Sequence, residues 1–185
     1  MKSAHDLMLQ IQREQLAHDI IAHRDILNLD TTTRLKHMAL HFLKYAGKIA
    51  AVSGVRDNEK LAHTVIDAFI ICLATANALN VNLGKYWSCT GKDLQNLAEQ
   101  MASEEDIDDI FIFSLFSLVE ISGKMAKSIE STDHLERGNP RDELEDLIPK
   151  LARSMLLTLG ILKTPIEDSV KRRWIAVESK SIFSK

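Results

Sequence analysis

Glycine and proline are scarce in this chain, with 7 Gly and 3 Pro among 185 residues. A many-stranded β fold needs more turn residues than that. Hydrophobic residues make up 45% of the sequence, which is enough for one sizeable core at this length. We therefore predict an all-α helical bundle.

Cysteine is also rare. The two cysteines, Cys72 and Cys89, do not show the paired spacing of a zinc site. We expect Cys72 to be a core residue of an apolar helix, which fits a reducing, cytoplasmic environment.

Charge of one sign is not in excess, because the formal net charge is -3. Such a chain has no general attraction to nucleic acid, and we interpret the basic run Lys171-Arg172-Arg173 as a solvated helix end. The most hydrophobic run, Ile110 to Val119, is far shorter than the roughly 20 residues that a bilayer span needs. We interpret it as a buried helix segment and expect neither nucleic acid nor a membrane as a partner.

A short pattern occurs twice in the chain. Residues 41–51 read HFLKYAGKIAA and residues 117–127 read SLVEISGKMAK, which aligns Gly47 with Gly123. Each copy precedes a turn and a second apolar helix, so the sequence predicts two diverged helical hairpins. The expected parts are an N-terminal helix with the first hairpin (1–83), a linker with a short helix (84–102), and the second hairpin with a C-terminal helix (103–185).

Helical periodicity and capping residues predict the individual helices. Ser103-Glu104-Glu105-Asp106 has the form of a capping box, so we expect the second hairpin to open there. The expected helices cover residues 4–27, the stretch from the Asp30–Thr33 cap to about 53, 59–80, 92–101, the stretch from the capping box to about 131, a helix from Pro140, and one from Thr164-Pro165 to Trp174.

Three features of the sequence form one pattern: the paired helices, the Gly-Lys-x-Ala stretch, and Ile66-Asp67-Ala68-Phe69 with the following residues 76–81. In this pattern the chain resembles the all-α nucleoside triphosphate pyrophosphohydrolase superfamily, which includes MazG-like and dimeric dUTPase-like proteins. The resemblance covers roughly residues 35–83 and, less closely, 115–162. It implies hydrolysis of a nucleoside triphosphate to a monophosphate and pyrophosphate. It also implies Mg²⁺ held by Glu-x-x-Glu on one helix and Glu-x-x-Asp on the next.

The first hairpin departs from that family pattern. It has Tyr45-Ala46-Gly47-Lys48 in place of Glu-x-x-Glu, and only Asp67 remains of Glu-x-x-Asp. Folding the hairpin about its turn places Lys44 opposite Asp67 and Lys48 opposite His63. We therefore expect a lysine–carboxylate ion pair instead of a metal site. Alternatively, Lys44 and Lys48 contact a phosphate directly.

The second hairpin keeps more of the acids. Glu143 and Asp146 have the family spacing and share a helical face, Glu120 lies on the facing helix, and Lys124 takes the position of a family glutamate. The candidate Mg²⁺ ligands are thus Glu120, Glu143 and Asp146. The alternative is an acidic first helical turn that the helix dipole favours.

Histidines form further candidate pairs. His37 and His41, like His63 and Asp67, are spaced four residues apart on a helix, but the two pairs face different levels of the hairpin. His18-Asp19 resembles the dipeptide of metal-dependent phosphohydrolases, although the other residues of that motif have no clear place in the sequence. We interpret these histidines as satisfied structural or solvent-facing side chains.

Three functional interpretations remain open. The first is a Mg²⁺-dependent nucleotide pyrophosphohydrolase with a partly eroded metal motif. The second is a catalytically inactive nucleotide-binding or regulatory module. The third is a structural protein that oligomerises through its apolar helices, for example as a homodimer.

Overall fold

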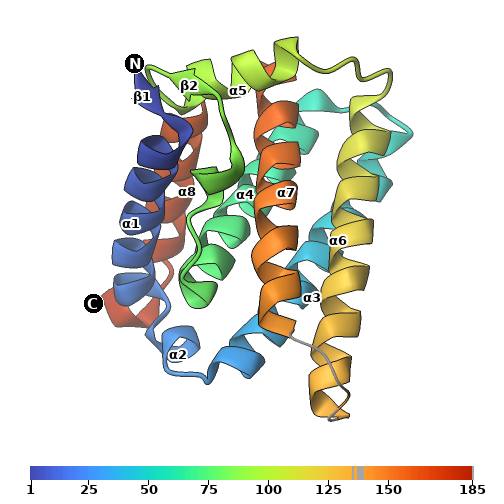
Figure 1. Cartoon of the computed structure of the whole chain (residues 1–185). Coiled ribbons are helices and arrows are strands. Elements are labelled where there is room, and N and C mark those ends of the chain that lie inside the picture. The colour runs from blue at the N-terminus through green and yellow to red at the C-terminus, as the bar shows by residue number, and fades with distance from the viewer. Residues whose placement is uncertain (135, 137–139, 185) are drawn as a thin grey trace.

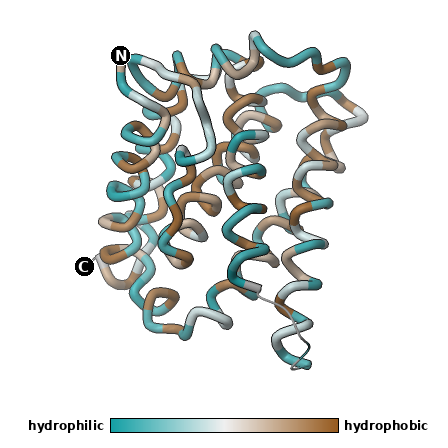
Figure 2. Tube along the Cα trace, viewed as in Figure 1, coloured by the Kyte–Doolittle hydropathy of each residue, from teal (hydrophilic) through white to brown (hydrophobic). Residues whose placement is uncertain are grey.

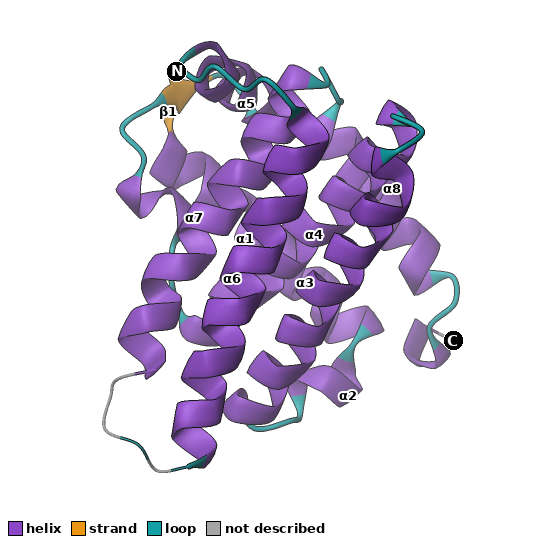
Figure 3. Ribbon diagram, turned by 90° about the vertical axis from the view of Figure 1, so that its right-hand side faces the viewer, coloured by secondary structure: helices purple, strands orange, loops and turns teal. Residues whose placement is uncertain are grey.

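The computed structural model describes residues 1–134, 136 and 140–184, and it confirms the all-α prediction. Most of the described chain is helical, as the purple ribbon in Figure 3 shows. The elements in chain order are β1 (Lys2–Ser3), α1 (Ala4–Ala22), α2 (Arg24–Leu27), α3 (Thr31–Ser53), α4 (Asn58–Leu79), η1 (Leu83–Tyr86), β2 (Thr90–Gly91), α5 (Leu94–Ser103), α6 (Ile110–Asp133), α7 (Pro140–Ile161), α8 (Ile166–Glu178) and η2 (Ile182–Ser184).

Two helical hairpins, α3–α4 and α6–α7, pack together as a four-helix bundle (Figure 1). Helix α3 packs against α6, and α4 packs against α7. Lys36 pairs with Asp133 at one end of the α3–α6 contact and Arg56 with Asp109 at the other, so these two helices are antiparallel. Buried side chains from both hairpins belong to one hydrophobic core.

Helices α1 and α8 pack on α4, while α5 packs on α7 and lies across one end of the bundle (Figure 1). The first residues of the chain are held in place, because β1 pairs with β2 in an antiparallel ladder. Alternating teal and brown along α1, α6 and α7 in Figure 2 marks the amphipathic pattern that sets which side of each helix is buried.

Aspartates fix the start of the hairpin helices. Asp30 accepts a hydrogen bond from the Thr33 N–H and Asp57 from the Lys60 N–H, each at 3.0 Å. The first hairpin therefore has the predicted helices to within one or two residues. The two hairpins also have helices of nearly equal length.

The capping-box prediction at Ser103–Asp106 is wrong. Helix α5 continues to Ser103, and α6 begins only at Ile110, where the carboxylate of Asp109 accepts from the N–H groups of the first turn. The predicted helix over residues 4–27 is also divided, because His23 leaves the helical conformation with φ -134° and ψ 40°.

The prediction that Ile110–Val119 is buried holds for only one side of α6. Phe111, Ser114 and Leu118 are buried, whereas Phe116 and Val119 are exposed. Helix α4 is instead the most enclosed element. By length and composition it is the one helix of the described chain that could cross a membrane, but most of its apolar stretch is buried inside the bundle.

One glycine permits a close contact between helices. A Cβ atom added to Gly160 on α7 would lie 2.3 Å from the carbonyl oxygen of Ala98 on α5. By contrast, Gly47 and Gly123 have nothing within 4 Å of such a Cβ. The repeated glycines are therefore not required for packing within the chain, whereas Gly160 is.

Candidate functional site

Asp67 lies on α4 and is only 5% exposed. Its two carboxylate oxygens accept hydrogen bonds from Arg173 of α8, with Nε–Oδ1 at 2.6 Å and Nη2–Oδ2 at 3.2 Å. The planar guanidinium matches a carboxylate in this two-bonded geometry, which a lysine cannot reproduce. The sequence prediction paired Asp67 with Lys44. The partner is Arg173 because the segment interpreted as a solvated helix end is part of α8, which packs on α4.

Lys44 and Lys48 lie close to this ion pair on α3. Their ammonium groups are 4.6 and 5.4 Å from the centre of the Tyr45 ring. The Lys44 ammonium is also 2.9 Å from His41 Nδ1. Burial lowers the pKa of Lys44, and the positive charge of Lys48 lowers it further. The pKa of His41 falls to about 4 because of burial and the nearby Lys44 charge, so this imidazole is neutral at pH 7.

A pocket of about 420 Å³ lies between α4 and α8, and Arg173 is one of the residues that line it. We call it the α4–α8 pocket. His63, Arg172 and Arg173 line it together with hydroxyl side chains, and Glu59 is the one carboxylate in its lining. Arg172 donates a hydrogen bond from Nη2 to the Ser169 hydroxyl at 3.0 Å.

We call Lys44, Lys48, Arg172 and Arg173 the basic cluster. Arg173 pairs with Asp67, and Arg172 lines the α4–α8 pocket together with Arg173. Lys44 is close enough to Lys48, Asp67 and Arg173 for their charges to act on it. Only Arg173 in this cluster is ion-paired to a carboxylate within the described part of the chain. His63 Nδ1 lies 4.0 Å from Asp67 Oδ2 and adds positive charge when it is protonated. Such an excess of donors over acceptors suits an anionic ligand.

The acids of the second hairpin lie on the surface and are paired with lysines. Glu120 is ion-paired with Lys124 on α6, and Asp146 with Lys150 on α7 at 2.8 Å. The hydrogen bond from Lys124 is the main cause that lowers the pKa of Glu120, and the charge of Lys150 contributes. Glu143 is exposed on α7.

These three acids do not form a shared ligand set. Over residues 1–134, 136 and 140–184, only His18, Asp19 and His23 bring three ligand atoms within 4.8 Å of one another. An ammonium group stands beside both Glu120 and Asp146, and it would oppose a divalent cation there. The structure thus does not bring Glu120, Glu143 and Asp146 together around one point, and their binding of Mg²⁺ stays a prediction.

Comparison of the chain with protein-family models, with curated proteins and with solved structures finds no match. The resemblance to the nucleotide pyrophosphohydrolases therefore remains a prediction that rests on the sequence pattern.

Proposed function

We propose that the chain binds a nucleotide or a similar phosphorylated small molecule at the basic cluster. The observation that carries this proposal is the convergence of cations from α3 and α8 on one buried carboxylate, beside the α4–α8 pocket. Arg172 and Lys48 remain available for a ligand because neither is ion-paired to a described carboxylate. Phosphate oxygens are the acceptors that arginine and lysine side chains bind most strongly.

The sequence resemblance narrows the ligand class to nucleotides. The positions at which the resembling family holds its metal with carboxylates carry Tyr45 and Lys48 in this chain. Direct contact between ammonium groups and phosphate replaces a bridging metal in this proposal. Hydrolysis with Mg²⁺ at Glu120, Glu143 and Asp146 stays a separate prediction, and assaying pyrophosphate release with and without Mg²⁺ tests it.

Nucleotide binding is expected without added metal. In isothermal titration calorimetry at low salt, a nucleoside triphosphate should bind to the wild type, and its affinity should fall as ionic strength rises. Lys48→Gln and Arg172→Gln should each weaken binding by about tenfold or more, since a charged hydrogen bond contributes about 1.5–3 kcal/mol. Lys150→Gln, on the second hairpin, is the matched control and should leave the affinity unchanged. If no common nucleotide binds, or if the control variant weakens binding as much, the proposal is refuted.

We also propose self-association of the chain through the outer faces of α3 and α6. Equivalent positions of the two repeats carry exposed apolar side chains. The nearby Gly47 and Gly123 have open space where a side chain would be. Exposed apolar patches often mark interaction surfaces. The exposed residues are Leu40 (66%) and Phe116 (61%) at one repeat position, and Leu43 (57%) and Val119 (46%) at the other. Because α3 and α6 are antiparallel, a two-fold axis between them would relate these equivalent positions, and in this proposal the surface pairs with a second copy of itself.

Sedimentation velocity tests the homodimer. The wild type should sediment as a dimer, and the double variant Leu43→Glu with Phe116→Glu should sediment as a folded monomer, because two charges would be buried at the interface. Val55→Glu changes an exposed apolar residue in the connection between α3 and α4, and this variant should remain dimeric. A wild type that stays monomeric over the accessible concentration range would exclude this mode of assembly.

A further inference from the structure

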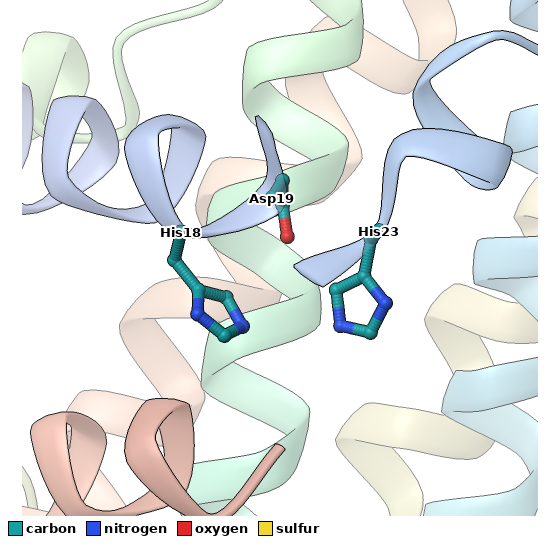
Figure 4. A group of neighbouring side chains, drawn as sticks. All are labelled: His18, Asp19 and His23. Atoms are coloured by element: carbon teal, nitrogen blue, oxygen red, sulfur yellow. The ribbon is translucent and has the colours of Figure 1, made fainter. Parts of the chain in front are cut away.

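A second polar centre lies where α1 ends, away from the acids of the second hairpin. His18 and Asp19 belong to the last turns of α1, and His23 is the residue at which the chain leaves that helix. One ligand atom from each residue lies within 4.8 Å of the others. Figure 4 shows ring nitrogens of the two histidines turned towards each other, with the Asp19 carboxylate between the two side chains.

His18 is oriented by a carboxylate on another helix. Its Nδ1 is 2.8 Å from Oε1 of Glu178 on α8, and its side chain is only 4% exposed. When Nδ1–H donates to Glu178, the ring keeps its lone pair on Nε2, the nitrogen that remains for a ligand. A metal-binding histidine commonly has such a carboxylate partner, which fixes its tautomer and its orientation.

Asp19 is oriented in the same way. The Gln15 amide donates to Asp19 Oδ1 at 2.8 Å, and Trp174 Nε1 in turn donates to Gln15 Oε1 at 2.7 Å. The ring of Trp174 also stacks on His18, with the ring centres 5.7 Å apart. Two of the three candidate ligands are thus held by an outer layer of hydrogen bonds and packing before any ion binds.

The open side of this centre faces a small cavity of about 80 Å³. Asp19 and His23 line the cavity, and a single water needs about 10–15 Å³ of such space, so several waters fit. Arg34 also lines this cavity, and its Nε is buried and has no hydrogen-bond partner within the described residues. This N–H can donate a hydrogen bond to a water molecule or a small anion in the cavity.

A cation would also compensate the charge of the buried carboxylate. Asp19 is only 7% exposed, so water does little to stabilise its negative charge. Two imidazoles with one carboxylate suit Zn²⁺ and similar transition-metal ions, whereas Mg²⁺ and Ca²⁺ prefer ligand sets made of oxygen alone.

We propose that His18, Asp19 and His23 bind one divalent transition-metal ion, with Zn²⁺ as the reference ion, and that its remaining coordination positions face the cavity beside Arg34. This site is independent of the phosphate-binding proposal, because none of its three ligands belongs to the basic cluster.

The test uses the full chain after treatment with a chelator. Titration with Zn²⁺ and with Co²⁺ should show one strong site per chain, and the visible absorption of bound Co²⁺ should report nitrogen and oxygen ligands. Mg²⁺ should not compete. Asp19→Asn and His23→Gln should each weaken Co²⁺ binding by more than about a hundredfold, while Glu178→Gln, which acts through His18, should weaken it by about tenfold.

Two controls separate this site from other histidines. His5→Gln removes an exposed histidine of α1 and should have no effect. His41→Gln removes a member of the His37–His41 pair, whose Nε2 atoms are 3.1 Å apart, and should leave strong binding intact. If the wild type has no strong site, if His23→Gln binds as tightly as the wild type, or if His41→Gln alone abolishes binding, the proposal is overturned. Should Asp19→Asn fail to fold, unchanged binding in Glu178→Gln and His23→Gln would still refute it.

Discussion

Replacing Asp67 with alanine is expected to lower the free energy of unfolding by about 2–3 kcal/mol. The substitution leaves the Arg173 guanidinium unpaired against α4, and breaking a buried ion pair costs about 3–5 kcal/mol when both partners are enclosed. The expected loss is smaller than that range because the Arg173 side chain is 31% exposed, although that of Asp67 is only 6% exposed. Urea denaturation followed by circular dichroism measures the difference.

The matched control for this prediction is Asp146→Ala. Asp146 also forms an ion pair on its helix, but its side chain is 62% exposed and that of Lys150 is 64% exposed. The control should cost no more than about 0.5 kcal/mol. Equal losses in the two variants would contradict the structural role of Asp67. If Mg²⁺ stabilises the wild type but does not stabilise the Asp67→Ala variant, Asp67 is instead a metal ligand.

The same glycine-to-alanine change should have opposite effects at two positions. Gly160→Ala should destabilise the chain by about 1–3 kcal/mol, because the new methyl group would push α7 away from the backbone of α5. Gly123→Ala should stabilise it by about 0.5–1 kcal/mol, because the methyl group enters open space and alanine favours a helix. Thermal unfolding of both variants checks the pair. If Gly160→Ala is as stable as the wild type, α5 does not lie against α7 as closely as described.

Much of the bundle could be predicted from local patterns. Asp30 and Asp57 precede apolar helices and cap them, and the nearly continuous apolar character of residues 61–79 marks α4 as central. The start of α6 was harder, because Ser103 and Asp109 are both good capping residues only six positions apart. Their local signals are alike, and the packing of α5 against α7 decides between them.

The sites depended on contacts that no local pattern contains. The apolar spacing of Ile166, Val170 and Trp174 marks the buried face of α8, but it does not say which helix that face meets. Arg173 therefore had no visible partner in the sequence. His18 and His23 are five residues apart, a spacing that separates two side chains on a regular helix. The two histidine side chains converge because α1 ends between them. The sequence has neither a glycine nor a proline there from which this helix end could be predicted.

The central position of α4 has a consequence during synthesis of the chain. Ile161, the last residue of α7, leaves the ribosome roughly 80 residues after Leu79, an interval of roughly 4–16 s at about 5–20 residues per second. Until then, the side of α4 that α7 later covers has no partner within the nascent chain. We therefore expect slow translation of the second hairpin to lengthen the exposure of this apolar side of α4 and to reduce the yield of soluble protein.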